Sequence, residues 1–159
     1  MNPLRPILIA IALSLAIVAP ASGQDFQQGL EAHRRGDYDT ALHEFRPLAE
    51  QGNALAQRFL GRLYELGNGV PKNGTEALRW YRLAAEQGDA FAQYSLGKIF
   101  GKGQLVRQDD TEAVRWYRLA AEQGLAVAQS NLGLSYELGR GVRQNDTEAV
   151  RWYRLAGEQ

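Results

Sequence analysis

The sequence predicts an all-α protein: an α-solenoid of about four antiparallel helix pairs, preceded by an N-terminal signal segment. Two repeated strings lead to this prediction. Trp-Tyr-Arg-Leu-Ala begins at Trp80, Trp116 and Trp152, so it recurs every 36 residues. The string Ala-Glu-Gln-Gly recurs with the same period. Periods of 20–50 residues are typical of solenoids, in which each unit buries its apolar face against its neighbours.

The first element, residues 1–23, has the pattern of a secretory signal peptide. Arg5 is the only charged side chain before Asp25, and residues 7–19 form an apolar run that is short for a membrane span. Small residues follow, so we expect cleavage after Ala21 or Gly23. An uncleaved anchor is the alternative, which the short run disfavours. The mature protein is expected to be periplasmic or secreted, without stable membrane insertion.

Four units follow: a divergent one over 24–52 and three repeats over 53–88, 89–124 and 125–159. In each, a first helix (helix A) and a second helix (helix B) are joined by a short loop, which makes them antiparallel neighbours. Helix A of the second unit begins near Asn53 and ends at Gly67. The chain contains no cysteine, so packing alone must hold these helices together.

Helix B has a recurring start signal. Asn73, Asp109 and Asn145 each precede a glutamate by three residues. This spacing predicts a capping box, in which the cap side chain and the glutamate each bind a backbone N–H of the other residue.

Glycine recurs inside helix A at Gly61, Gly97 and Gly133. Glycine there costs about 1 kcal/mol against alanine, which suggests a compensating close contact between helices. We expect an aromatic ring of helix B to cover each glycine, and Gly97→Val to destabilise the fold where Gly97→Ala does not. The aromatic residues predicted to be structural are Trp80, Tyr81, Trp116, Tyr117, Trp152 and Tyr153.

The two end units differ from the others. Phe45 replaces the repeated tyrosine in the first unit. The sequence stops at Gln159, at the end of a helix B. We therefore expect Trp152, Tyr153 and Leu155 to present apolar surface at this C-terminal edge, where a partner or a second copy of the chain would bind.

These residues resemble the Sel-one-like repeat family, a relative of the tetratricopeptide repeats. The resemblance covers 53–159 and rests on Gly67-Asn68-Gly69-Val70, Ala77, Trp80-Tyr81, Ala84-Ala85, Gly88, Ala92 and Leu96-Gly97. Leu105 departs from the pattern, because Gly69 and Gly141 stand there in the other repeats, and its loop should follow another path. The resemblance implies an adaptor that binds a protein partner; several secreted bacterial members act in envelope assembly or signalling.

The repeats vary unevenly, which indicates a binding surface. Helix B of the last two repeats differs only at Ala121 against Gly157, whereas helix A varies at most outward-facing positions. These varied positions share one helical face, and helix A usually lines the concave surface of such solenoids. The partner-binding candidates are Arg58, Arg62, Tyr94, Lys98, Ser130 and Asn131. Ordinary drift of solvated positions is the alternative.

Two other functions are alternatives to the adaptor: a periplasmic regulator of a membrane sensor, and an accessory protein that binds polysaccharide or peptidoglycan. The second would use a ladder of arginines on helix B, namely Arg79, Arg82, Arg115, Arg118, Arg151 and Arg154. Glutamates follow Arg82, Arg118 and Arg154 at i+4, which predicts self-compensated ion pairs on a solvated face instead.

Catalysis, cofactors, metal ions and nucleic acid find no support in the sequence. His33 and His43 are the two histidines and lie in different helices of the divergent unit. No thiol is present, and no phosphate loop or nucleophile motif occurs. With 18 basic and 18 acidic residues, the chain has no overall attraction for nucleic acid. We expect no enzyme, no cofactor, no metal site and no nucleic-acid partner.

Overall fold

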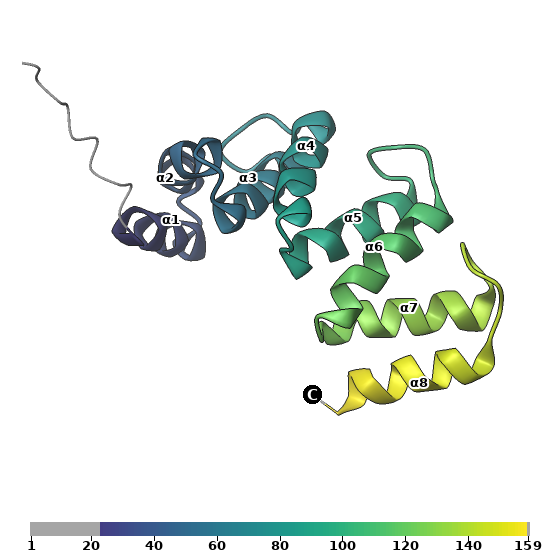
Figure 1. Ribbon diagram of the computed structural model, residues 1–159. Coiled ribbons are helices and arrows are strands. Elements are labelled where there is room, and N and C mark those ends of the chain that lie inside the picture. The colour runs from purple at the N-terminus through teal and green to yellow at the C-terminus, as the bar shows by residue number, and fades with distance from the viewer. Residues whose placement is uncertain (1–22, 159) are drawn as a thin grey trace, which may run out of the picture.

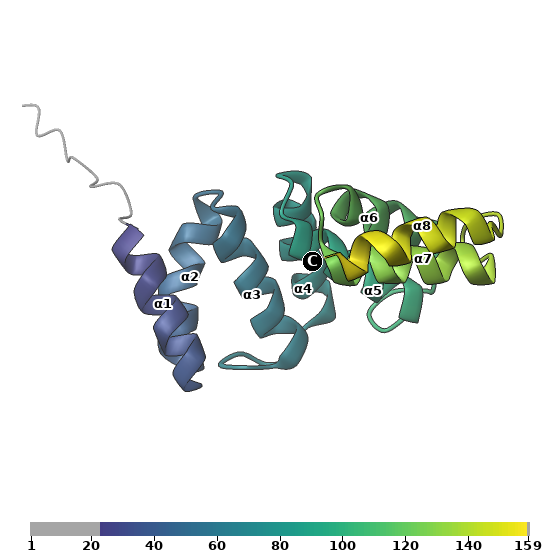
Figure 2. The same ribbon diagram turned by 90° about the horizontal axis from the view of Figure 1, so that it is seen from below.

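The computed structural model describes residues 23–158, which fold into α-helices and connecting turns without a strand in that range. The helices are α1 (Gly23–Arg35), α2 (Tyr38–Glu50), α3 (Ala54–Leu66), α4 (Gly74–Glu86), α5 (Ala90–Lys102), α6 (Asp110–Glu122), α7 (Ala126–Leu138) and α8 (Asp146–Gly157). Each helix packs on the ones before and after it along a curved path (Figure 1). The axes turn along this path, so α7 and α8 lie across the direction of α1 and α2 in Figure 2.

The all-α solenoid of four helix pairs is thus confirmed. Odd-numbered helices are helix A and even-numbered helices are helix B of the successive units. The predicted signal peptide lies outside the described residues apart from Gly23, the first residue of α1. No helix within 23–158 is long and apolar enough to cross a membrane.

The core runs through the stack as three clusters, and each repeated tryptophan joins the cluster of the preceding unit. Trp80 of α4 packs with Leu60 and Leu63 of α3 and with buried residues of α1 and α2. Trp116 and Trp152 join the next two clusters in the same way. A large ring that reaches back into the previous unit couples neighbouring repeats into one continuous core.

Buried glutamines add a polar ladder beside this core. Gln57 donates its amide to the Ala49 carbonyl at 3.0 Å and accepts from Gln87 at 2.7 Å. Gln93 repeats the pattern with Ala85 at 3.1 Å and Gln123 at 2.7 Å. The bonds to Ala49 and Ala85 fasten helix A to the end of the preceding helix B, and the bonds between glutamines fasten it to the end of its own helix B. Buried amides must find such partners.

The capping box predicted at helix B forms only in part. The side chains of Asn73, Asp109 and Asn145 accept from the glutamate backbone N–H three residues later, at 2.9–3.1 Å. The reciprocal bond is not made, since each cap N–H donates instead to a helix A carbonyl, as from Asn73 to Tyr64 at 3.0 Å. The glutamate carboxylates are therefore available for other contacts.

Tyrosine, and not tryptophan, covers the helix A glycines. A Cβ at Gly61, Gly97 or Gly133 would lie 2.5–3.0 Å from a ring carbon of Tyr81, Tyr117 or Tyr153, respectively. The predicted close contact is confirmed, but the expected tolerance of Gly97→Ala is wrong. Even a methyl group at Gly97 overlaps the ring of Tyr117.

The loop with Leu105 takes a different path, as predicted, because no residue other than glycine has a positive φ between 23 and 158. Gly69 and Gly141 have a φ of 69°, and a Cβ at either position would overlap the backbone at the start of the preceding helix B, at Tyr38 and Asp110. In the middle repeat, the side chain of Leu105 fills the equivalent space above Gly74. In this repeat the glycine, Gly74, lies at the start of helix B and the larger residue, Leu105, lies in the loop. Loop and helix therefore still approach each other closely.

The expectation for the C-terminal edge is wrong for Trp152. Its ring is buried in the third core cluster, because it reaches back toward α6 and α7 as Trp80 and Trp116 do in their units. Tyr153 is exposed and Leu155 is half-buried. The most exposed apolar side chain of α8 is instead Val150, at 66%.

Candidate functional site

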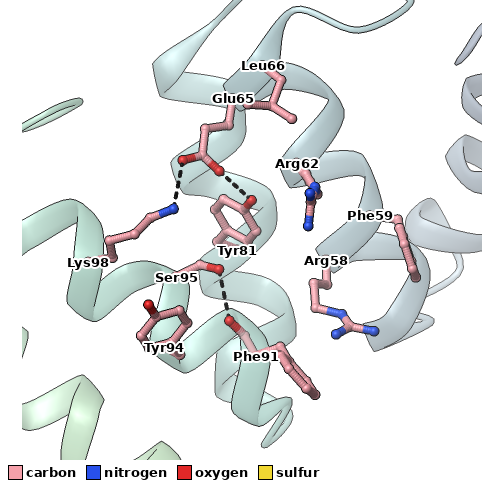
Figure 3. A pocket seen from close by; sticks show the side chains of 10 residues that line it. All are labelled: Arg58, Phe59, Arg62, Glu65, Leu66, Tyr81, Phe91, Tyr94, Ser95 and Lys98. Carbon is pink, nitrogen blue, oxygen red and sulfur yellow. Dashed lines mark hydrogen bonds and ion pairs between the residues drawn. The ribbon is translucent and has the colours of Figure 1, made fainter. Parts of the chain in front are cut away.

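A cavity of about 360 Å³ opens between α3 and α5, with Tyr81 of α4 at its base (Figure 3). It is lined by Arg58, Phe59, Arg62, Glu65, Leu66, Tyr81, Phe91, Tyr94, Ser95 and Lys98. Four of the six predicted partner-binding residues are in this lining: Arg58, Arg62, Tyr94 and Lys98. The helical spacing that placed them on one face therefore also brings them to one cavity.

Arg58 is held in place from three directions. Its guanidinium lies 5.0 Å from the ring centroid of Phe59 and 4.9 Å from that of Phe91. It also pairs with Asp89 at 3.5 Å. Asp89 caps α5 by accepting from the Ala92 N–H at 2.7 Å. Cation–π contacts and a half-buried ion pair thus fix this guanidinium against both aromatic walls.

Glu65 joins the three helices around the cavity. Its carboxylate accepts from the Tyr81 hydroxyl at 2.7 Å and pairs with Lys98 at 3.6 Å (Figure 3). Burial, followed by the Glu65 charge, raises the pKa of Tyr81 well above its ordinary value. Tyr81 therefore stays a neutral hydrogen-bond donor throughout the physiological pH range.

Arg62 is exposed and has no ion pair within residues 23–158. The pKa of His33, on α1, is lowered by burial and by the positive charge of the Arg62 guanidinium. His33 of α1 packs edge-on against Phe59, with ring centroids 5.3 Å apart. The aromatic surface at the cavity therefore continues from α5 through α3 to α1.

The remaining two candidates lie apart from this cavity. Asn131 lines a second cavity of about 200 Å³ between α5, α6 and α7, and its amide donates to the Val127 carbonyl at 2.7 Å. Ser130 is exposed and lines neither cavity. The structure separates the six candidates into a main group, one residue at the second cavity and one on open surface.

Phe59 and Phe91 were not among the predicted candidates, although helical spacing places Phe91 on the same face as Tyr94 and Lys98. Phe91, Tyr94 and Lys98 are spaced i, i+3, i+7 on helix A. Phe59 belongs to the site because it packs against Arg58 of the same helix and His33 of α1. No sequence spacing reports this second contact.

The arginine ladder pairs differently from the expectation. Arg79, Arg115 and Arg151 pair with the glutamate three residues earlier at 2.6–3.3 Å, because the open capping box leaves those carboxylates available. Of the i, i+4 pairs expected, Arg154–Glu158 forms at 3.7 Å.

Arg82 and Arg118 contact the next unit instead. Arg118 donates to the Tyr136 hydroxyl at 3.0 Å, and Arg82 lies 5.9 Å from the ring centroid of Phe100. The predicted pairs Arg82–Glu86 and Arg118–Glu122 are therefore wrong.

Helix pairs in one curved stack, with a cavity between successive A helices, define an α-solenoid of helix-pair repeats. The Sel1 repeat family model matches 54–89, 90–125 and 126–159. The chain belongs to the Sel1 repeat family, as the resemblance implied. Sel1 repeat proteins are protein-interaction scaffolds and are typically not catalytic. No curated protein sequence matches the chain.

Solved structures agree with this family. A Sel1 repeat protein from Oxalobacter formigenes is 40% identical with a TM-score of 0.80, and the match covers 84% of this chain and 53% of that one. The protein c5321, a protective antigen of uropathogenic Escherichia coli strains with an SLR fold, is 37% identical with a TM-score of 0.81, covering 86% and 30%.

Helicobacter pylori cysteine rich protein B shares the fold alone, at 21% identity and a TM-score of 0.56, covering 82% and 86%. The present chain spans about half of the Oxalobacter protein and less than a third of c5321.

Proposed function

We propose that this chain is an exported scaffold that binds a segment of a partner protein on its helix A face, with the cavity between α3 and α5 as the main contact. The carrying observation is that four candidates from two different repeats line one cavity. Solenoids bind extended or helical segments on such surfaces. Export rests on the signal-peptide pattern of residues 1–23, and a role in envelope assembly or signalling rests on the family resemblance.

The rigidity of the stack supports binding of a segment. Arg58 and Lys98 are each held by a carboxylate, and Tyr81 is buried beneath them. Side chains that are already ordered lose less conformational entropy when a partner binds. The partner therefore meets a preformed surface.

The polysaccharide alternative loses support from the arginine ladder. Arg79, Arg115 and Arg151 are each paired with a glutamate, and each guanidinium lies 4.1–5.2 Å from the ring centroid of the tryptophan that follows it. A ligand would have to displace these contacts.

Site-specific crosslinking in cells that export the protein tests the proposal. A photo-crosslinking residue replaces Phe91 at the cavity or, as a matched control, Leu119 on helix B; both side chains are exposed. We expect one defined protein adduct, identified by mass spectrometry, from position 91 and none from position 119. Adding Tyr94→Ala with Lys98→Glu should remove the adduct while thermal unfolding still reports a folded chain.

The converse pattern would contradict the proposal. Equal capture from both positions, or capture unaffected by the double substitution, places the partner elsewhere. Loss of capture with Arg79→Glu and Arg115→Glu, but not with the cavity variant, assigns binding to the arginine ladder. A protein that stays in the cytoplasm contradicts export.

A further inference from the structure

The cavity between α3 and α5 carries unbalanced positive charge. Three cationic side chains line it, Arg58, Arg62 and Lys98, against one carboxylate, Glu65. Asp89 lies beside the lining and is already engaged by Arg58 and by the α5 backbone. One positive charge is thus left over, and it belongs to Arg62.

Arg62 differs from its two neighbours in being unpaired. Within the described chain, Arg58 and Lys98 each pair with an acidic side chain, at 3.5 and 3.6 Å, whereas Arg62 pairs with none. In Figure 3 its guanidinium lies between Phe59 and Tyr81, within the ring of residues that line the cavity. A guanidinium has a planar fork of N–H donors that matches a carboxylate.

Two exposed apolar side chains lie at the rim of the cavity. Phe91 is 53% exposed and Leu66 is 52% exposed, on opposite helices of the cavity. Exposed apolar side chains around a cationic centre complement a ligand that carries a negative charge next to apolar groups. A peptide offers both within a few residues, whereas a carboxylated polysaccharide offers the charge alone.

We propose that the cavity binds an acidic peptide segment, with a carboxylate on the Arg62 guanidinium and a neighbouring apolar side chain against the exposed ring of Phe91. This inference rests on the proposed function and specifies the chemistry of the partner segment. The carboxylate comes from an aspartate or glutamate side chain; a peptide C-terminus has the same chemistry and is distinguished in the test.

Selection from a displayed dodecapeptide library on the purified chain tests the inference. We expect enrichment of peptides with aspartate or glutamate beside aromatic or aliphatic residues. The matched control is Arg107→Gln, which makes the same charge change as Arg62→Gln at an exposed arginine outside the cavity lining.

Binding of a selected synthetic peptide should weaken roughly tenfold to hundredfold with Arg62→Gln, because a hydrogen bond to a charged group is lost, and should be unchanged with Arg107→Gln. Binding should also weaken as salt is raised. Amidating the C-terminus should leave affinity unchanged if a side chain supplies the carboxylate. Replacing the acidic side chain by its amide should then reproduce the loss seen with Arg62→Gln.

A second readout follows the site itself. An anion bound at Arg62 offsets the positive charge that acts on His33, so the pKa of His33 measured by NMR should rise when the peptide binds. Binding without any change at His33 would overturn the assignment to Arg62.

Three further outcomes show whether this inference fails alone or together with the proposed function. Enrichment of basic or uncharged peptides that still depend on Tyr94 and Lys98 overturns the acidic chemistry and leaves the scaffold function intact. No enriched peptide at all contradicts both. Binding of polygalacturonate that depends on Arg62, without any peptide enrichment, assigns the cavity to a polysaccharide and contradicts both.

Discussion

Helices α6 and α8 have nearly the same sequence but different surroundings. From 111–123 to 147–159 the residues differ only at Ala121 and Gly157. Yet Val114 of α6 is 5% exposed and Val150 of α8 is 66% exposed, and the corresponding tyrosines are 8% and 37% exposed. The tryptophans hardly differ, at 6% for Trp116 and 7% for Trp152.

The difference shows that helix B has two apolar faces with separate causes of burial. The tryptophan face packs back into the preceding unit, which both helices have. The valine face packs forward: α7 covers it on α6, and no described helix follows α8. Identical side chains therefore contribute differently to stability, because burial depends on the neighbouring repeat.

The largest losses of stability are expected from substitutions on the tryptophan face, where α6 and α8 should behave alike. Trp116→Ala and Trp152→Ala should each lower the free energy of unfolding by about 3–5 kcal/mol, because each leaves a large cavity. Urea unfolding followed by circular dichroism measures this. A small loss for Trp152→Ala alone would mean that the last unit frays independently of the stack.

Substitutions on the valine face should affect the stability of α6 and α8 most differently. Val114→Asp places an unpaired carboxylate in the core and should cost about 3 kcal/mol or more. Val150→Asp should change stability by less than about 0.5 kcal/mol, since that side chain is exposed. The same unfolding experiment compares them; a large loss with Val150→Asp would show that a second copy covers α8 in solution.

Substitutions of Gly97, covered by Tyr117, and of Gly133, covered by Tyr153, should also differ in their effect on stability, but by less. Gly97→Ala forces the buried Tyr117 ring to move and should cost about 1–3 kcal/mol. Gly133→Ala should cost less than about 1 kcal/mol, because Tyr153 is 37% exposed and its ring has solvent on one side to move into, and alanine favours the helix. Thermal unfolding of both variants checks the order, and equal losses would contradict it.

The smallest effect concerns tyrosine ionisation. Burial raises the pKa of Tyr117 to about 12, whereas a hydrogen bond to Glu137 at 2.6 Å raises that of Tyr153 to about 12. Glu137→Gln should therefore lower the pKa of Tyr153 toward its ordinary value and leave Tyr117 unchanged.

Ultraviolet titration of tyrosinate measures both groups. The sign for stability follows from the raised pKa: the neutral tyrosines favour the fold fully below about pH 10, and this contribution is lost as the pH rises through about 12. A Tyr153 pKa that does not respond to Glu137→Gln would contradict the hydrogen bond as its cause.

Local signals in the sequence were sufficient for the helices and their order. Gly67 and Asn73 are the C-cap of α3 and the N-cap of α4 because their conformational preferences depend on backbone chemistry alone. The 36-residue period predicted the stack, since each unit repeats the same packing surface. The candidate face on helix A followed from helical spacing.

The partners of polar and aromatic side chains required the tertiary structure. Arg118 bonds to Tyr136, eighteen residues away, in preference to the nearby Glu122, because α7 brings the hydroxyl within reach. Phe59 is positioned at the site partly by its contact with His33 of α1. Ser130 lies away from the cavity because of the relative positions of α5 and α7.

The repeated helix pair and its caps follow from the sequence alone, as do the residues able to pack, because these depend on local conformation and a fixed period. The tertiary structure decided which of those residues are buried and which cations remain unpaired. Trp152 is buried and Val150 is exposed because contacts with adjacent repeats, and not residue type, set their environment. Arg62 stands out for the same reason: within residues 23–158, Arg58 and Lys98 pair with carboxylates on other segments, whereas Arg62 has no ion pair.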